Sequence, residues 1–368
     1  MNVVGLTTTS AERKRRAGQR LVLGIAGPSL TDEERAWIRH CQPGGFVLFA
    51  RNVEEAGQVF ELNRELASLL PKDLPPIRCV DQEGGRVQRV KSPATVWPPM
   101  RWVGNVDQEA FSVAIGRALG REVRALGFDL DFAPVADVDS NPKNPVIGDR
   151  AFAAEAAAAG RHAAAMVRGL QAEGCIACAK HFPGHGDTAT DSHLELPVVE
   201  KDPPDLDQVE LVPFRACLRA GVATVMTAHV VYPGWDEDRP ATMSHRIVDG
   251  ILRKRLKFQG VVFSDDMEMK AVRGRYPLEQ QLTEASVATV DSFLMCKDLS
   301  LQVQAFEELI RLQESDKGQA DLAIDAAKRW HGLRERFLKD PSPRPGLDIL
   351  GNHTHLDLAL RARAEGQA

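Results

Sequence analysis

Short apolar runs recur along the chain, each followed by turn residues and then by a stretch of helical character. Eight of these runs are too short for helices and rich in valine, isoleucine, leucine and phenylalanine, which is typical of strands buried on both faces. They are RLVLGIAG (20–27), GGFVLFA (44–50), PIRCVD (76–81), FDLDFAP (128–134), CIACAK (175–180), VATVMTAH (222–229), GVVFSDD (260–266) and DSFLMC (291–296). The pattern predicts eight buried parallel strands.

The segments between the runs carry helix signals. Residues 31–41 open with Thr31, a residue type that caps helix N-termini, an alanine-rich segment stops at Gly174, and residues 299–314 follow the last run. A strand followed by a helix, repeated eight times, favours a closed barrel over an open sheet. The predicted fold is α/β, a single (β/α)8 TIM-like barrel. The alternative, a doubly wound sheet, lacks a G-x-G-x-x-G after its first strand.

The barrel is expected to form one domain over residues 19–338, because barrels of alternating strands and helices reach this length undivided. Residues 1–18, which contain a basic cluster, are expected to be a flexible N-terminus. Residues 339–368 contain a Pro/Gly break followed by a terminal helix. This tail is too short for a second domain, and we expect its helix to pack on the barrel.

Charge and hydropathy narrow the range of partners. Acidic and basic residues are interspersed, and the formal net charge of the 368-residue chain is -5. No basic stripe suits a nucleic acid or an anionic membrane, so neither is an expected partner. No apolar run is long enough to cross a bilayer, and no secretory apolar region follows the N-terminal basic cluster. We therefore expect a cytoplasmic protein, and the sequence says nothing of its oligomeric state.

Six cysteines lie in apolar segments, which is typical of reduced core thiols. Cys175 and Cys178 form a C-x-x-C motif. Their segment has strand character, however, and strand positions three apart face opposite sides. The pair is therefore not expected to bind metal or to act in redox chemistry.

Polar residues follow several of the predicted strands. In a barrel, active-site groups lie just past the C-terminal ends of the strands. The residues at these positions are Asp81, Asp131, Lys180, His181, His229, Asp265 and Asp266. An unpaired charge at a barrel mouth is costly to desolvate, so each needs a partner or a ligand. The sequence predicts a convergent polar pocket.

The loop KHFPGHGDTATDSHLELP (180–197) packs three histidines, two aspartates and two glycines beside a strand end. This density favours a functional loop over a solvated surface loop. Metal binding by His181, His185, Asp187 and His193 is an alternative, although their spacing matches no standard zinc motif. The glycines and the lack of apolar anchors predict that the loop moves between open and closed positions.

The segment VVFSDDMEM places Asp265 and Asp266 at a strand tip. Neighbouring strand residues point to opposite sides, so only one of the two is expected to face the barrel axis. An alternative is a structural ion pair between Asp265 and Arg150 or Lys180. The glycine-rich turn DQEGGRVQR (81–89) is a weak signal on its own, since such turns often need glycine for backbone reasons alone.

Six segments, taken in order, resemble the family 3 glycoside hydrolases, and most of all the bacterial β-N-acetylglucosaminidases of peptidoglycan recycling. The segments are LFARNV (48–53), DQEGGRVQR (81–89), NPVIGDRAF (144–152), KHFPGHGDTATDSH (180–193), MTAHVVYPGWDEDRPATMS (226–244) and FSDDMEM (263–269). The resemblance covers about residues 20 to 300, and the KHFPGHG…DSH run is highly specific to this group.

This resemblance implies a retaining exo-β-N-acetylhexosaminidase that releases terminal β-linked N-acetylglucosamine from muropeptide fragments. It assigns Asp265 as the nucleophile, His193 as the acid/base and Asp191 as the residue that orients His193. The substrate-binding residues that it implies are Asp81, Arg89, Arg150, Lys180 and His181. It implies no cofactor and no metal.

A histidine proton donor departs from the two carboxylates of most retaining glycosidases. A neighbouring carboxylate favours imidazolium, so Asp191 could keep His193 protonated. Two other functions stay open. One is a metal-dependent barrel hydrolase that uses the 181–193 loop, and the other is a catalytically silent sugar-binding module that keeps Asp81, Arg150 and Lys180. Turnover of an aryl N-acetylglucosaminide separates both enzymes from the binding module, and survival of that turnover in a chelator separates the glycosidase from the metal-dependent hydrolase.

Overall fold

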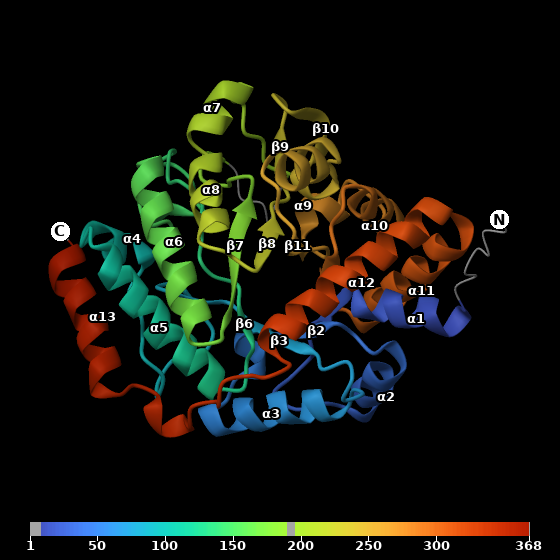
Figure 1. Ribbon diagram of the computed structural model, residues 1–368, viewed down its shortest axis with the longest axis horizontal. Coiled ribbons are helices and arrows are strands. Elements are labelled where there is room, and N and C mark those ends of the chain that lie inside the picture. Colours follow the sequence, from blue (N-terminus) through green and yellow to red (C-terminus); the bar gives the residue numbers. More distant parts are fainter. Residues whose placement is uncertain (1–8, 190–195, 368) are drawn as a thin grey trace.

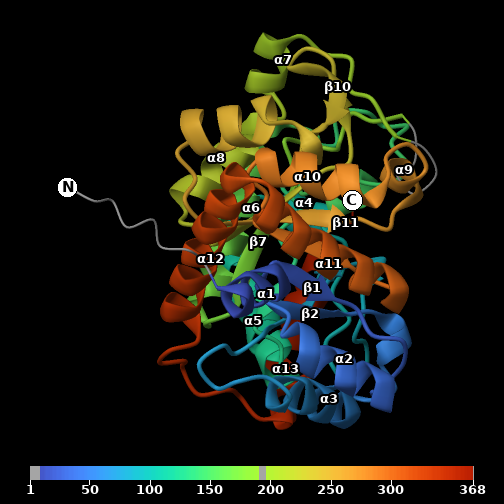
Figure 2. The same cartoon turned by 90° about the vertical axis from the view of Figure 1, so that its right-hand side faces the viewer.

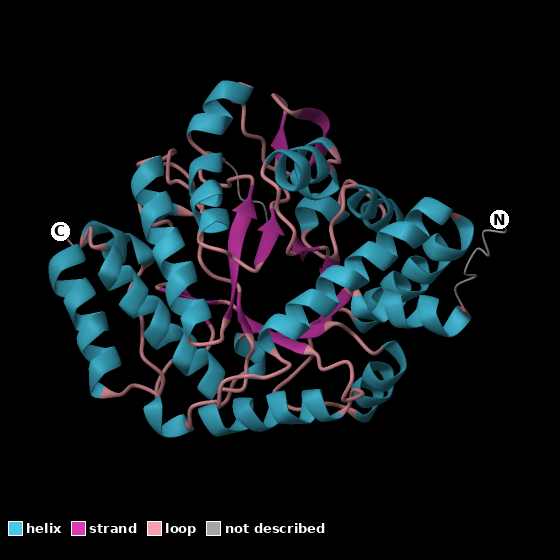
Figure 3. Cartoon of the chain, viewed as in Figure 1, coloured by secondary structure: helices cyan, strands magenta, loops and turns pink. Residues whose placement is uncertain are grey.

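The computed structural model describes residues 9–189 and 196–367 and contains a closed barrel of parallel strands enclosed by helices (Figures 1 and 3). In order around the barrel the strands are β1 (Leu21–Leu23), β12 (Ser292–Met295), β11 (Val261–Asp266), β8 (Thr224–Thr227), β7 (Ile176–Phe182), β6 (Leu130–Asp131), β3 (Ile77–Val80) and β2 (Gly45–Leu48). Each predicted run supplies one of these strands. The predicted barrel is confirmed, and the doubly wound sheet is excluded.

Helices connect successive strands and cover the outside of the barrel (Figure 3). They are α1 (Ser10–Gln19), α2 (Asp32–Cys41), α3 (Ala56–Ser68), α4 (Met100–Asn105), α5 (Glu109–Ala125), α6 (Ala156–Ala172), α7 (Pro203–Gln208), α8 (Leu211–Arg219), the π-helix η4 (Arg246–Arg255), α9 (Lys270–Arg273), α10 (Leu278–Val287), α11 (Leu299–Ser315), α12 (Lys317–Phe337) and α13 (His353–Gly366). Within the described ranges, none of these helices has the length and apolarity that a bilayer crossing requires.

Two antiparallel hairpins extend the loops at the C-terminal ends of the barrel strands. One pairs β4 (Gln82–Gly84) with β5 (Val87–Gln88) directly after β3. The other pairs β9 (Val231–Tyr232) with β10 (Asp236–Pro240) after β8. Both hairpins therefore lie at the end of the barrel where a (β/α)8 enzyme carries its active site.

The ends of the predicted helices follow the expected local chemistry. The Thr31 hydroxyl accepts a 3.1 Å hydrogen bond from the backbone N–H of Glu34, and the Glu34 carboxylate accepts the backbone N–H of Thr31 in return. Gly174, two residues after α6, has a φ of 74°, a conformation that glycine adopts without steric cost. These contacts explain why α2 and α6 begin and end where the sequence indicated.

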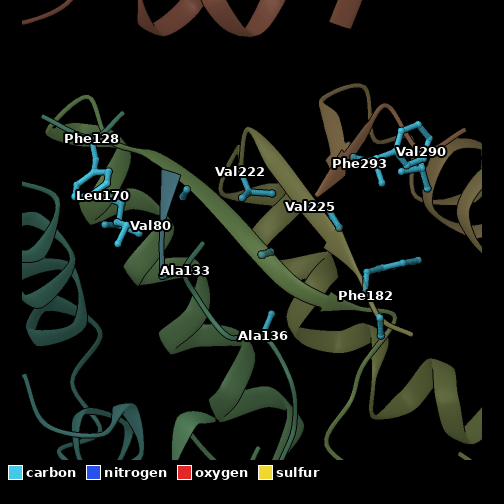
Figure 4. Packing of buried hydrophobic residues seen from close by; sticks show 14 of the residues in the cluster. Val80, Phe128, Ala133, Ala136, Leu170, Phe182, Val222, Val225, Val290 and Phe293 are labelled. Carbon is cyan, nitrogen blue, oxygen red and sulfur yellow. The ribbon is translucent and has the colours of Figure 1, made fainter. Parts of the chain in front are cut away.

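The core has an inner and an outer part. Inside the barrel, Phe132 and Phe263 pack edge to face, and Trp330 of α12 packs against Phe263 to close the N-terminal end of the barrel. A second cluster fills the space between the strands and the helices, where Figure 4 shows Phe128 beside Leu170. Buried Cys178 belongs to the inner cluster and buried Cys175 to the outer one. The prediction that these thiols face opposite sides is confirmed.

The N-terminal segment differs from the expectation of a flexible stretch over residues 1–18. Residues Ser10–Gln19 form α1, which begins with a capping box between Thr9 and Glu12. This helix packs against α11 and α12 (Figure 2). Its last residues, Ala17 to Gln19, are buried. The basic residues concealed this helix in the sequence, because they occupy its exposed face.

The C-terminal tail is attached to the barrel through a buried carboxylate. Helix α13 packs against α4 and α5. Glu122 of α5 accepts hydrogen bonds from the backbone N–H of Gly351 and from Nδ1 of His355, both 2.9 Å long. The same carboxylate accepts the backbone N–H of Thr95 at 3.0 Å and its hydroxyl at 2.7 Å. Glu122 thus joins the tail to the segment that follows β5.

Candidate active site

A cavity of about 1020 Å³ opens at the C-terminal ends of the strands. Its lining includes six of the eight predicted site residues, which are Asp81, Arg89, Arg150, Lys180, His181 and Asp265. Phe132, Met226 and Leu294, from the interior of the barrel, also line it. The other two predicted site residues, Asp191 and His193, lie outside the described residues. The predicted convergence of polar strand ends is therefore found for the described part of the site.

Lys180 is the centre of a buried ionic network. Its ammonium group lies 2.6 Å from Asp81 and 2.6 Å from Glu83, and its side chain is 2% exposed. The carboxylate of Glu83 also accepts two 2.8 Å hydrogen bonds from Nε and Nη2 of Arg150. Burial alone would raise the pKa of both acids, but the surrounding cations outweigh it and lower the pKa of Glu83 to about 2. The network is thus fully ionised at neutral pH.

The β4–β5 hairpin brings Arg89 back to Asp81, where Nη2 donates a 3.1 Å hydrogen bond to the carboxylate. The turn requires its glycines, because Gly84 has a φ of 96° and a Cβ there would lie 2.7 Å from a backbone oxygen of Pro98. Side-chain amides hold the hairpin in place, and Nε2 of Gln88 donates to the Thr95 carbonyl at 2.8 Å. One segment therefore contains both a glycine that the backbone requires and a residue, Arg89, that lines the cavity.

His181 is oriented by a carboxylate that comes from a different strand end. Asp137 is fully buried and accepts a hydrogen bond from Nδ1 of His181 at 2.8 Å. It also accepts the backbone N–H groups of His181 at 3.1 Å and His185 at 2.7 Å. The pairing of β7 with β8 is irregular between Ala179 and Phe182, which lets Lys180 and His181 line the same cavity. Asp137 fixes both the ring and the main chain at this point.

Asp265 and Asp266 both line the cavity, although strand alternation would turn only one of them toward the barrel axis. Strand alternation fails here because the pairing of β11 with β12 shifts register between Phe263 and Asp266. The backbone N–H of Asp266 donates a 2.8 Å hydrogen bond to Oδ1 of Asp265. Burial alone would raise the pKa of Asp265, but the nearby rings of His229 and His181 outweigh it and lower that pKa. Asp265 is therefore a carboxylate at neutral pH.

The environment of Asp266 has the opposite effect. Burial and the negative charges of Glu268 and Asp265 raise the pKa of Asp266 to about 6. The proposed structural ion pair of Asp265 with Arg150 or Lys180 is not formed, since these cations bind Asp81 and Glu83. Among the described residues Asp265 makes no salt bridge. Two adjacent carboxyl groups thus differ in pKa, and the one with the lower pKa, Asp265, makes no salt bridge with any described residue.

His229, at the end of β8, borders these two acids. It is 1% exposed, its Nε2 donates to the backbone carbonyl of Asp266 at 3.1 Å, and its Nδ1 lies 2.9 Å from the Thr242 hydroxyl. Burial lowers the pKa of His229, and the Asp265 carboxylate opposes this effect. We infer a supporting role for this ring beneath the β11 strand end.

The described part of the 180–197 loop does not form a metal site. Asp187 is 3.0 Å from the Lys201 ammonium group, His181 is bonded to Asp137, and burial lowers the pKa of His185 to about 4. Across residues 9–189 and 196–367, no group of three or more histidine, cysteine or acidic side chains could hold a metal ion. The fourth candidate ligand, His193, lies outside these ranges.

Two site residues were not singled out in the sequence. Glu83 bridges Arg150 and Lys180, and Asp137 orients His181. Glu83 lies in the DQEGGRVQR turn and Asp137 three residues after the predicted strand 128–134, so both occupy the strand-end positions that drew attention to their neighbours. The rule that strand-end charges converge would have found both, had it been extended by a few residues.

Comparison with known proteins places this chain in a family. Residues 14–328 match the Glycosyl hydrolase family 3 N terminal domain. A β-hexosaminidase of Pseudomonas aeruginosa (strain LESB58) is 40% identical over 320 residues, which cover 84% of this chain and 95% of the relative. One of Nitrosomonas eutropha is 38% identical over 284 residues, covering 76% of this chain and 80% of the relative.

Solved structures of similar proteins support the same family. A glycoside hydrolase family 3 β-N-acetylglucosaminidase from Paenibacillus sp. superimposes with a TM-score of 0.90 at 34% identity, covering 96% of this chain and 68% of that one. NagZ from Neisseria gonorrhoeae, in complex with N-trifluoroacetyl-D-glucosamine, gives a TM-score of 0.76 at 31% identity, covering 94% of this chain and 98% of that one. With a family match over most of its length and relatives at about 40% identity, the chain belongs to glycoside hydrolase family 3 and is a glycoside hydrolase of the β-hexosaminidase type.

Proposed function

We propose that this glycoside hydrolase is a retaining exo-β-N-acetylhexosaminidase that removes terminal β-linked N-acetylglucosamine from muropeptide fragments in the cytoplasm. One observation carries the proposal. Asp265 is an ionised carboxylate that lines an open cavity at a strand end and has no salt bridge among the described residues. A carboxylate in this state is able to act as a nucleophile, because its charge is not already compensated.

The ionic network on the other side of the cavity supplies the sugar-binding groups. Lys180, Arg150 and Arg89 are held by Asp81 and Glu83, so their remaining N–H groups have fixed directions. Charged hydrogen bonds to sugar hydroxyls contribute about 1.5–3 kcal/mol each. His181, fixed by Asp137, completes this set. These residues bind the N-acetylglucosamine unit while Asp265 approaches its anomeric carbon.

The reaction has two steps. An Asp265 oxygen attacks the anomeric carbon, the bond to the leaving oxygen breaks, and His193 donates its proton to that oxygen. His193, now neutral, then takes a proton from water, the water oxygen attacks the same carbon, and the bond to Asp265 breaks. Each of the two steps inverts the configuration at the anomeric carbon, so the product retains the original configuration. Asp191 is assigned the orientation of His193, and both assignments come from the sequence motif.

The substrate class is supported by the relatives. The Paenibacillus structure is that of a β-N-acetylglucosaminidase, and the Neisseria protein holds an N-acylated glucosamine. The muropeptide aglycone follows from the resemblance to enzymes of peptidoglycan recycling. Product analysis with an aryl N-acetylglucosaminide, in buffers with and without phosphate, would show whether water or phosphate accepts the glycosyl group.

Trapping of the covalent intermediate tests the proposal directly. A slow-turnover fluorosugar with N-acetylglucosamine configuration should label the enzyme, and peptide mass spectrometry should locate the label on Asp265. A label on Asp266, Asp81 or Asp131 would overturn the assignment. The complete absence of p-nitrophenyl N-acetyl-β-glucosaminide turnover would instead favour the sugar-binding module.

A further inference from the structure

A second cavity, of about 890 Å³, lies at the end of the barrel opposite the candidate active site. It is bounded by the C-terminal ends of α8 and η4, by the first residues of β8 and β11, and by the side of α12. Seven arginine and lysine residues line it, against one acidic residue, Asp325. The chain as a whole is acidic, with a net charge of -5, so this local excess of positive charge is not a general property of its surface.

Only part of this positive charge is neutralised. Asp207 lies 3.7 Å from Arg215 and binds Arg255 through both of its carboxylate oxygens. Asp325 binds Lys328 at 2.8 Å. Helix C-termini carry about half a negative charge each, so α8 and η4 offset about one further cation.

Three other cations of the cavity have no acidic partner. Arg336 donates to the backbone carbonyl of Gly221 at 3.2 Å. The side chains of Arg219 and Lys257 make no hydrogen bond or ion pair with any described residue, and both residues are exposed. The cavity therefore presents cationic groups that are free to bind a ligand.

Buried charge beneath the cavity adds to the excess. Asp291 is fully buried and shared by two arginines, Arg253 at 2.6 Å and Arg329 at 2.7 Å. A third, Arg20, donates to the Asp291 backbone carbonyl at 3.2 Å. Arg253 is 9% exposed, and its Nε has no hydrogen-bond partner. One carboxylate thus binds two guanidinium groups and is the nearest acid to a third, in a region of low dielectric constant where uncompensated charge is costly.

The pKa values of Arg20 and Arg253 are lowered, as expected for buried cations that share too few acidic partners. Burial lowers the pKa of Arg20 to about 10, against the effect of Asp291, and the charge of Arg329 lowers it further. Burial and Arg329 also lower the pKa of Arg253. An anion in the cavity would act in the opposite direction and stabilise all three charges.

We propose that this cavity is a binding site for a phosphorylated small molecule of about nucleotide size. Guanidinium groups match the oxygen geometry of phosphate, and a concave wall of one charge sign concentrates the electrostatic field. The volume falls within the range of small-molecule sites. Leu218, Phe258 and Leu333 provide apolar surface for the uncharged part of the ligand. The site lies outside the sugar-binding cavity and is independent of it.

Isothermal titration calorimetry of the full chain with sodium pyrophosphate, uridine 5′-diphosphate and uridine tests this proposal. At low ionic strength we expect saturable one-site binding of at least one phosphorylated probe and none of uridine. N-acetylglucosamine at saturating concentration should leave this binding unchanged. Added sodium chloride should weaken it.

The variant Arg219→Glu with Lys257→Asn should lose at least tenfold in affinity for the phosphorylated probe. Asn is chosen because Lys257 has a φ of 61°, which asparagine tolerates. The control is Arg121→Glu, at an exposed cation of α5 that does not line the cavity, and this variant should bind as the wild type does. Both proteins should keep aryl N-acetylglucosaminidase turnover. No saturable binding to the wild type, equal binding by the double variant, or competition by N-acetylglucosamine would each overturn the proposal.

Discussion

Glu83 accepts two hydrogen bonds of 2.8 Å from one guanidinium group, that of Arg150, and both side chains are at most 10% exposed. Removal of one partner from a buried pair leaves an uncompensated charge and costs about 3–5 kcal/mol. We expect Glu83→Gln to lower the free energy of unfolding by about 3 kcal/mol, measured by urea denaturation. KM should rise as well, because Arg150 and Lys180 lose their fixed positions. The control Glu307→Gln, on an exposed face of α11, should change neither quantity, and an unchanged KM in Glu83→Gln would contradict the positioning role.

The two adjacent acids of β11 provide a matched pair. Asp265→Asn should reduce kcat by at least about a thousandfold, as the loss of a nucleophile does, while ligand binding persists. Asp266→Asn alters a carboxyl group whose pKa is already raised to about 6 and should keep most of the turnover at pH 5. Steady-state kinetics on p-nitrophenyl N-acetyl-β-glucosaminide measure both. Equal losses in the two variants would refute the assignment of the nucleophile.

Asp131 makes stability depend on pH. Burial raises its pKa from 3.8 to about 8, so the folded protein keeps a proton that the unfolded chain releases near pH 4. Stability that is fully present below pH 4 is therefore lost as pH rises toward 8. Relative to Asp131→Asn, the wild type should lose on the order of 5 kcal/mol over this interval. Urea denaturation of both proteins at pH 5, 7 and 9 measures the difference, and parallel curves would show that Asp131 is ionised in the folded state.

The proton-donor role of His193 predicts a dependence on the leaving group. His193→Ala should be slowed about 10²- to 10⁴-fold on substrates with poor leaving groups, and far less on dinitrophenol-type aglycones, which depart without protonation. With such aglycones the variant should give a burst and then stall at the glycosyl-enzyme. Asp191→Ala should show the same pattern more weakly, with the acidic limb of the rate profile moved. Equal slowing on all substrates would exclude His193 as the donor.

Treatment of the protein with a chelator tests whether it is a glycosidase or the alternative metal-dependent hydrolase. The described histidines of the 180–197 loop are bonded to Asp137 and Thr188. We expect dialysis against EDTA to leave aryl N-acetylglucosaminidase activity unchanged, since the proposed steps need only protein side chains and water. An activity lost on chelation and restored by zinc would favour the alternative.

Most of the fold was predictable because it depends on a repeated pattern. Each barrel strand is an apolar run buried on both faces, and this property is visible in the sequence at all eight positions. Helix α1 was not predicted, because its apolar content is low and its stability depends on packing against α11 and α12. A contact with the other end of the chain leaves no trace in a local pattern.

The candidate site was predictable in position but not in its internal pairing. Strand-end charges indicated which residues converge, and five of those seven residues line the cavity. That Glu83 rather than Asp265 pairs with Arg150 could not be read from the sequence, since the choice depends on how a hairpin folds back over the barrel. The joint exposure of Asp265 and Asp266 depends on a register shift between strands, which alternation rules do not anticipate.

The buried carboxylate of Glu122 connects the C-terminal tail to the hairpin at the candidate active site, so changes in the tail can affect that site. Gln88 of the substrate-side hairpin bonds to Thr95, Thr95 bonds to Glu122, and Glu122 bonds to Gly351 and His355 of the tail. This chain of hydrogen bonds connects the segment of α13 to the turn that contains Arg89. If Arg89 binds the sugar as proposed, damage to the tail should raise KM although the altered residues lie far from the cavity.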